Sequence, residues 1–120
     1  MGADNICIKD MANLLLPYDA YSLIKRLKSE VDVPIHLHTH NTTGTGDMTY
    51  LMAMQAGVDI VDCALSPFAN GTSQPATESL VATLKGTEND TGLDLGKLAE
   101  AAKHFRGVAE RMMKEGILDP

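Results

Sequence analysis

Hydrophobic and polar positions along the chain follow two alternating periods, which predicts strands separated by helices. Short apolar runs with β-branched residues, typical of buried strands, occupy residues 5–9, 34–40 and 58–64. Apolar residues at helical spacing occupy residues 17–31, 47–57, 78–84 and 95–112. Strands that alternate with helices in this way are successive βα units, and such units form parallel sheets. The pattern therefore predicts an α/β fold.

Two of the predicted helices carry more specific expectations. Asp47 is placed to cap the second helix. The inward face of that helix would then carry Met48, Leu51 and Met52. One face of the last helix is apolar and is formed by Leu95, Leu98, Ala102, Phe105, Ala109 and Met112. His104 lies on the same helix and is interpreted as a surface or packing residue.

Composition and charge narrow the function classes. With 120 residues, 44% of them hydrophobic and 22% charged, the chain is one small globular domain or a piece of a larger one. A net charge of −6 argues against nucleic acid, because no basic surface is available to displace counterions from phosphates. No apolar run is long enough to span a bilayer, and no secretory signal opens the chain. Cys7 and Cys63 fall in predicted strands and are interpreted as small buried hydrophobes in a reduced setting.

Ionisable residues gather where the predicted strands end. His36, His38 and His40 share one face of the second strand, because side chains alternate with period two. Lys9 closes the first strand and Asp62 lies near the end of the third. In a barrel of βα units the chemistry lies at these strand ends, and two imidazoles can bind a divalent cation at about 2.0–2.1 Å per Zn–N bond. On these residues alone, a polar strand end with water-bound histidines is an equal alternative.

Several short motifs run along the whole chain in a fixed order. They are Gly2-Ala3-Asp4, Ile8-Lys9-Asp10-Met11-Ala12, Pro17-Tyr18-Asp19-Ala20-Tyr21, His36-Leu37-His38-Thr39-His40, Ala56-Gly57-Val58-Asp59-Ile60-Val61-Asp62, Gly71-Thr72-Ser73-Gln74-Pro75, Gly86-Thr87-Glu88 and Thr91-Gly92-Leu93-Asp94. In this order they resemble the carboxyltransferase domain of biotin-dependent pyruvate carboxylases, and most closely the α subunit of oxaloacetate decarboxylase.

The resemblance implies a (β/α)₈ TIM barrel that moves a carboxyl group between carboxybiotin and pyruvate or oxaloacetate, by way of enolpyruvate. The chain would be a single fragment of that barrel: about the last three βα units over residues 1–85, and a C-terminal helical extension over 86–120. Biotin would be carried on a separate domain or subunit. The location would be cytoplasmic, or peripheral to a membrane decarboxylase complex. The family's substrate-binding Arg-Asp motif has no counterpart here, so the fragment alone is expected to be inactive.

The resemblance also implies a divalent metal, Zn, Co or Mn, bound by Lys9, His38 and His40. Lys9 would be the catalytic residue, carboxylated on its amine. An ammonium cannot bind a metal, but burial favours the neutral amine, which reacts with CO₂ to give a carbamate with oxygen donors. The alternative for Lys9 is a strand-end lysine that reaches into water. The family's aspartate ligand has no counterpart, and Asn41 stands where relatives often carry Asp.

Further residues are weaker candidates. Asp62, Thr72 and Gln74 would line the substrate pocket, with loop and barrel packing as the alternative. His36 is predicted to be a hydrogen-bonded histidine of the barrel interior rather than a third ligand. The metal would polarise the keto oxygen of the substrate and stabilise the enolate.

Two other functions stay open. A metal-dependent aldolase or acyl-lyase barrel would share the His-x-His motif, although Lys9-Asp10-Met11 favours carboxyl transfer. A non-catalytic, truncated assembly module would keep the fold without turnover. Expected partners are pyruvate or oxaloacetate, the biotin carrier domain, and either the remainder of the barrel or a second copy of the chain. Self-association is expected because the sheet edges would be open and Ile35, Leu37 or Ile60, whichever faces the barrel interior, would be uncovered.

Overall fold

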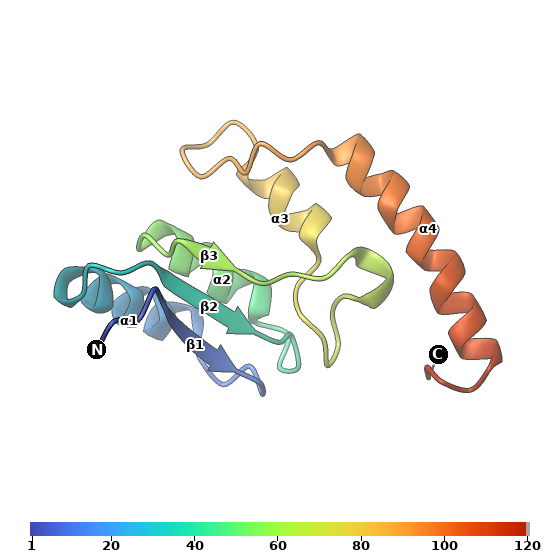
Figure 1. Cartoon of the computed structure of the whole chain (residues 1–120), viewed down its shortest axis with the longest axis horizontal. Helices are drawn as coiled ribbons and strands as arrows, with labels where there is room; N and C mark the ends of the chain where they lie inside the picture. The colour runs from blue at the N-terminus through green and yellow to red at the C-terminus, as the bar shows by residue number, and fades with distance from the viewer. Residues whose placement is uncertain (120) are drawn as a thin grey trace.

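The structure of the chain is a computed structural model, and it describes residues 1–119. Its elements alternate along the chain as the sequence predicts (Figure 1). They are β1 (Ile6–Asp10), α1 (Pro17–Glu30), β2 (Ile35–Thr39), α2 (Gly46–Gln55), β3 (Ile60–Val61), the 3₁₀ turn η1 (Ser66–Phe68), α3 (Thr77–Leu84) and α4 (Leu95–Lys114). None of the helices within residues 1–119 is long and apolar enough to cross a membrane.

The three strands form one parallel sheet in the order β1-β2-β3. Its register places Lys9 opposite His38 and His36 opposite Ile60. The third strand is shorter than the predicted run over residues 58–64. The last backbone hydrogen bond to β2 runs from the Asp62 N–H to the Leu37 carbonyl at 3.3 Å, and Ala64 then forms a parallel bridge with Ala76 instead. A distant segment therefore replaces the pairing that the apolar run suggests.

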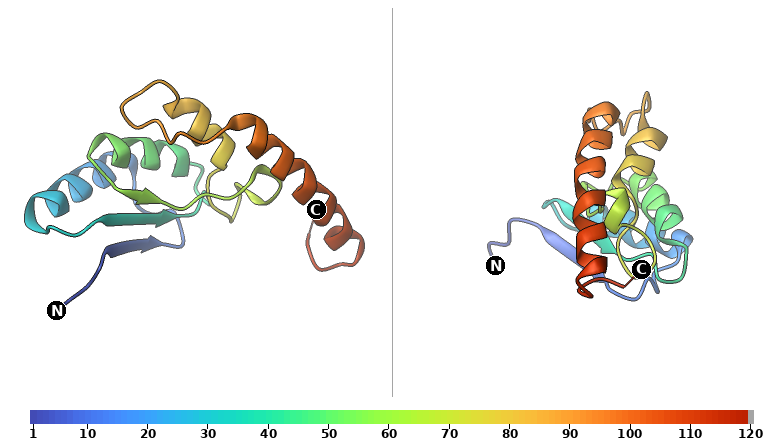
Figure 2. Two further views of the ribbon diagram at one scale, coloured as in Figure 1. Left: turned by 45° about the horizontal axis from the view of Figure 1, so that its top comes forward. Right: turned by 90° about the vertical axis from the view of Figure 1, so that its right-hand side faces the viewer.

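One face of the sheet is covered and the other is open. Helices α1 and α2 pack on the covered face, as the left view of Figure 2 shows. Ile35 and Leu37 point into this core and are fully buried, so of the two parities that the sequence left open, the one that would uncover Ile35 and Leu37 is excluded. The open face carries residues of the opposite parity, namely Cys7, Lys9, His36, His38 and Ile60. Ile60 has the parity of this open face, and it is 42% exposed.

The buried face of α2 differs from the prediction. Met48 and Leu51 are exposed, whereas Thr49, Tyr50 and Ala53 are fully buried against β2 and α1. Hydrophobicity favours methionine and leucine as core residues, but the direction in which α2 approaches the sheet selects the neighbouring face. The hydroxyl groups of Thr49 and Tyr50 can be buried because both find hydrogen-bond acceptors there.

The start of α2 also differs. Its N-cap residue is Thr45, and Asp47 lies inside the first turn. The side-chain oxygen of Asn41 accepts a hydrogen bond from the Gly46 N–H at 2.8 Å, so Asn41 caps the helix from the end of β2. The predicted cap at Asp47 is therefore wrong, because a residue near the end of β2 already satisfies the first free N–H.

Of the two cysteines expected to be buried, Cys63 is partly buried and Cys7 is not. Cys63 is half-buried, and burial raises the pKa of its thiol to about 12, which fits an inert packing residue. Cys7 is exposed, because its parity directs it to the open face. Helix α4 packs on α3 and η1, with Ala102 and Ala109 buried; the Phe105 ring is 39% exposed and lies edge-on to Phe68 of η1, with 6.2 Å between the ring centroids. The predicted extension ends at residue 120, which lies outside the described residues.

Candidate metal centre

Two imidazoles converge at the carboxyl end of β2. His38 lies within the strand and His40 follows it, both on the face away from α1 and α2. Their Nε2 atoms are 3.2 Å apart, and the ring planes are tilted by 58°. The shared face therefore follows from the period of the strand, as the His-x-His spacing predicts.

Each ring is held from its other nitrogen. Nδ1 of His38 lies 2.7 Å from a carboxylate oxygen of Asp62, and Nδ1 of His40 lies 2.5 Å from the backbone carbonyl oxygen of Thr72. Both partners can only accept, so each Nδ1 carries the ring proton when the ring is neutral. The lone pairs of the two Nε2 atoms therefore face the same small volume.

The orientation of the two Nε2 lone pairs suits a shared cation better than two rings that bind nothing in common. Two lone pairs 3.2 Å apart repel each other unless a donor or a cation lies between them. Bonds of about 2.0–2.1 Å at a tetrahedral angle separate two zinc-bound nitrogens by about 3.3–3.4 Å. The observed separation is close to this value, and neutral imidazole is a common ligand of divalent metals. The two histidines can therefore serve as neighbouring ligands of one cation.

Gln74 covers the histidine pair. Its amide nitrogen is 3.3 Å from Nε2 of His38 and 3.3 Å from Nε2 of His40. Its amide oxygen accepts a hydrogen bond from the Ser73 hydroxyl at 3.0 Å, which fixes the amide with its N–H groups toward the rings. The amide supplies the positive hydrogen atoms that the two lone pairs need. Gln74 therefore lies where a further group at the metal site would approach.

Asp62 joins two histidines. One carboxylate oxygen contacts His38, and the other lies 2.8 Å from Nε2 of His36. That second contact has the distance of an ion pair without the alignment of a hydrogen bond, because His36 Nε2 is buried with no hydrogen-bond partner in residues 1–119. Burial by itself would raise the pKa of the Asp62 carboxyl, but the contacts of His38 and His36 outweigh it and hold the pKa below its usual value.

The predicted substrate residues gather around these rings. Asp62 and Gln74 contact them through side chains, whereas Thr72 does so through its backbone carbonyl. The loop that carries Thr72 and Gln74 is attached to the end of β2 by a 2.8 Å hydrogen bond from the Asn41 N–H to the Ser73 carbonyl. The long loop is thus brought back to the histidines, as a site at the strand ends requires.

Lys9 lies on the same face without joining the cluster. It is opposite His38 in the sheet register and is exposed. Within residues 1–119 its amine makes no hydrogen bond or ion pair, and no group of three His, Cys, Asp or Glu side chains there could hold a metal ion. Residues 1–119 therefore do not bury the Lys9 amine, although burial is what would favour formation of the carbamate.

Sequence reasoning missed the residue that anchors Asp62. The hydroxyl of Tyr50 donates to the backbone carbonyl of Asp62 at 2.6 Å and accepts from the Thr39 N–H at 3.0 Å. Tyr50 is fully buried, and burial is the main reason why the pKa of its hydroxyl is raised. A tyrosine in an amphipathic helix gives no sign of such a role. The position of Asp62 could be found, since aligning the carboxyl ends of the strands puts it beside His38.

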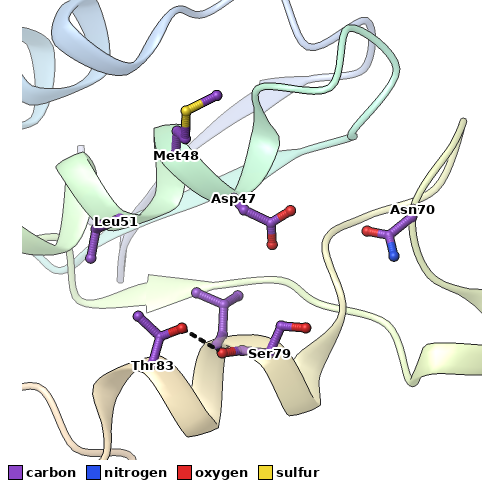
Figure 3. A pocket seen from close by; sticks show the side chains of 7 residues that line it. Asp47, Met48, Leu51, Asn70, Ser79 and Thr83 are labelled. Atoms are coloured by element: carbon purple, nitrogen blue, oxygen red, sulfur yellow. Dashed lines mark hydrogen bonds between the residues drawn. The ribbon is translucent and has the colours of Figure 1, made fainter.

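A separate hollow of about 270 Å³ lies between α2 and α3 (Figure 3). Asp47 and Asn70 border it, and on the α3 side the Thr83 hydroxyl donates to the Ser79 carbonyl within the helix. Asn41 contacts both Asp47 and Asn70, which connects the hollow to the end of β2. Neither metal-site histidine lines it, so it adds no ligand to the pair.

Comparison with known proteins places the chain in a family. The profile of the HMGL-like family matches residues 1–104. A pyruvate carboxylase chain of Methanocaldococcus jannaschii, one subunit of that enzyme, is 60% identical over 92% of the chain and 20% of the relative. The 2-oxoglutarate carboxylase large subunit of Hydrogenobacter thermophilus is 42% identical over 95% of the chain and 18% of the relative.

A solved structure agrees with this placement. The carboxyl transferase domain of Rhizobium etli pyruvate carboxylase, determined with pyruvate and biocytin, has a TM-score of 0.88 and is 43% identical over 89% of this chain and 18% of its own. The chain therefore spans about one fifth of the proteins that it matches. Its parallel sheet and helices correspond to a fragment of the carboxyltransferase barrel, and the chain belongs to the HMGL-like family, with carboxyltransferases of the pyruvate carboxylase type as its relatives.

Proposed function

We propose that this chain supplies the metal-binding end of a biotin-dependent carboxyltransferase, which moves a carboxyl group between carboxybiotin and a 2-oxo acid. The observation that carries the proposal is the pair of Nε2 atoms of His38 and His40, 3.2 Å apart with both Nδ1 atoms engaged elsewhere. Ring nitrogens held in this way are already oriented for one cation, so binding needs little rearrangement.

Lys9 is proposed as a third ligand in its carboxylated form. It lies on the same face as His38 and directly opposite that residue. A carbamate would bring an anionic oxygen donor, which complements two neutral imidazoles around Zn, Co or Mn. The burial that favours the neutral amine would come from protein segments other than residues 1–119. When bound, the metal supplies Lewis-acid polarisation of the substrate's keto oxygen.

The substrate is proposed to be pyruvate or oxaloacetate. One relative carries the name pyruvate carboxylase, another is a 2-oxoglutarate carboxylase, and one related structure holds pyruvate and biocytin. All of these names describe carboxyl transfer to a 2-oxo acid, which favours this reaction over an aldolase or acyl-lyase reaction. Asp62 and Gln74 contact the histidines, and we assign them to the walls of this site rather than to loop packing.

The partners follow from the same proposal. Residues 1–85 would be βα units of the barrel and residues 86–120 a helical extension, while further barrel segments would complete the site. The biotin carrier would be a separate domain or subunit, as the family resemblance implies. The chain on its own is expected to bind metal without turning over oxaloacetate.

Calorimetric titration of the tag-free chain with Zn²⁺ tests the proposal. We expect one site, and we expect the His38→Ala substitution to weaken binding by at least about tenfold, because it removes one of two ring nitrogens. His104→Ala is the matched control, since His104 is exposed on α4. Equal affinity of the wild-type chain and the His38→Ala variant would show that His38 is not a ligand.

A further inference from the structure

We infer that Asp62 is a positioning residue that holds His36 and His38 in opposite tautomers and thereby presents Nε2 of His38 to the cation. The inference rests on the proposed metal site for its purpose, but the arrangement of the three side chains stands by itself. His38 would carry its proton on Nδ1, and His36 would carry its proton on Nε2.

The sheet register brings the three residues together. His36 is paired with Ile60, so Asp62, two residues further along the chain, reaches the level of His38 on the same face. The carboxylate then lies between the two rings, 2.7 Å from Nδ1 of His38 and 2.8 Å from Nε2 of His36. Each oxygen serves one ring, which explains why a single carboxylate can act on both.

The contacts determine the tautomers. A carboxylate oxygen can only accept, so a ring nitrogen within 2.8 Å of it must carry a proton, because two lone pairs at this distance repel. For His38 that nitrogen is Nδ1, which frees Nε2. For His36 it is Nε2, which is buried, lies at ion-pair distance from the carboxylate and makes no hydrogen bond in the described part of the chain.

The backbone that carries this carboxylate is tied to β2. The hydroxyl of Tyr50 bridges the backbone of Asp62 and the backbone of Thr39, the residue between the two metal-site histidines. Tyr50 is fully buried in the core, so this bridge moves little. Asp62 is thus tied to the end of β2 by its backbone and to the rings by its side chain.

The arrangement makes the two proposed ligands unequal. His38 donates to a charged carboxylate, whereas His40 donates to the neutral carbonyl of Thr72. A carboxylate partner increases the electron density of an imidazole and strengthens it as a ligand, and loss of such a partner costs about 10–100-fold in metal affinity. Asp62 therefore has a defined role in the site although it touches no cation.

The first measurement needs neither metal nor a variant. ¹⁵N-edited NMR of the histidine rings in the wild-type chain, at mildly alkaline pH where imidazoles are neutral, distinguishes the two tautomers. We expect the Nδ1–H form for His38 and the Nε2–H form for His36. Either ring in the other form would overturn the inference, whatever the outcome for metal binding.

The second measurement compares variants. Asp62→Ala should lose the single tautomer of His38 and weaken Zn²⁺ binding about 10–100-fold, and Asp62→Asn, which keeps an accepting oxygen, should recover part of the loss. Asp59→Asn is the matched control, because Asp59 lies just before β3 and its carboxylate contacts Lys28 and the Ile35 N–H rather than the histidines. Unchanged His38 signals and affinity in Asp62→Ala would overturn the inference. Absent Zn²⁺ binding in the wild-type chain, with both tautomers as expected, would overturn only the proposed metal site.

Discussion

Asp10 ends β1 with its side chain turned away from the histidines. Its carboxylate accepts hydrogen bonds from the N–H groups of Leu14 and Leu15 at 3.0 and 2.9 Å, and from the Thr39 hydroxyl at 3.1 Å. It therefore attaches the β1–α1 loop to the end of β2, beside the metal-site histidines. Burial alone would raise the pKa of Asp10, but these hydrogen bonds hold it below its usual value of 3.8.

The contribution of Asp10 should be visible in how the free energy of unfolding changes with pH in the acid range. Because the folded-state pKa is lowered, the stabilisation is fully present above the unfolded value of 3.8 and is lost as the pH falls through the lower folded value. Asp10→Asn should reduce the free energy of unfolding at pH 7 by about 1–3 kcal/mol, and the difference from wild type should shrink toward about pH 2. Urea unfolding at both pH values measures it.

A matched variant separates this effect from a change in net charge. Asp4→Asn removes the same charge at an exposed position near the N-terminus. It should leave the free energy of unfolding within about 0.5 kcal/mol of wild type at both pH values. If Asp10→Asn behaves like Asp4→Asn, the hydrogen bonds of Asp10 contribute nothing measurable to stability.

At the scale of elements, the start of α2 packs directly on the strand end that carries the site. A Cβ atom at Gly46 would lie 2.8 Å from the side-chain oxygen of Asn41 and 2.9 Å from the backbone oxygen of His40. These distances are too short for carbon and oxygen, so one of the two elements would have to move. The absence of a side chain at Gly46 thus lets α2 approach β2 closely enough for Asn41 to cap it.

Substitution at this glycine should therefore disturb both stability and metal binding. Gly46→Ala is expected to lower the free energy of unfolding by about 1–3 kcal/mol and to weaken Zn²⁺ binding, because the backbone of His40 is displaced. Gly107→Ala, in the exposed middle of α4 with open space around it, should instead stabilise the chain by about 0.5–1 kcal/mol. Chemical unfolding and calorimetry of both variants provide the comparison. A Gly46→Ala variant with wild-type stability and affinity would show that the contact relaxes freely.

The elements also show what a sequence can and cannot predict. Local periodicity predicted the order of helices and strands, and the shared face of His38 and His40, because both depend on the backbone alone. The length of β3 depends on the bridge between Ala64 and Ala76, which is a long-range contact. The role of Tyr50 depends on how α2 meets the sheet, and the contacts of Asp62 depend on the register between β2 and β3. These relations arise only when the elements pack.

At the scale of the molecule, the described residues form a sheet covered on one face and open at both edges. β1 pairs only with β2, and β3 pairs only over its two residues. The uncovered face of the sheet carries Lys9, His36 and His38 beside Cys7 and Ile60, so it is not a continuous apolar patch. The related carboxyltransferase structure matches with a TM-score of 0.88 over 18% of its length, and a closed barrel has no free edges. The feature that needs a partner is therefore the row of unpaired backbone groups along β1.

We expect this edge to pair with a second copy when the chain is studied alone. Ile6 donates and Asp10 accepts toward β2, so the backbone groups of Cys7 and Lys9 point outward along the free edge. Two such edges can join about a two-fold axis, which buries the same strand on both copies. Light scattering in reducing buffer should give a mass that rises with micromolar concentration toward that of a dimer. Cys7→Pro, which removes an outward N–H, should keep the chain monomeric, whereas Cys7→Ser should not. A wild-type chain that stays monomeric and unfolds cooperatively would show that the edge of β1 needs no partner.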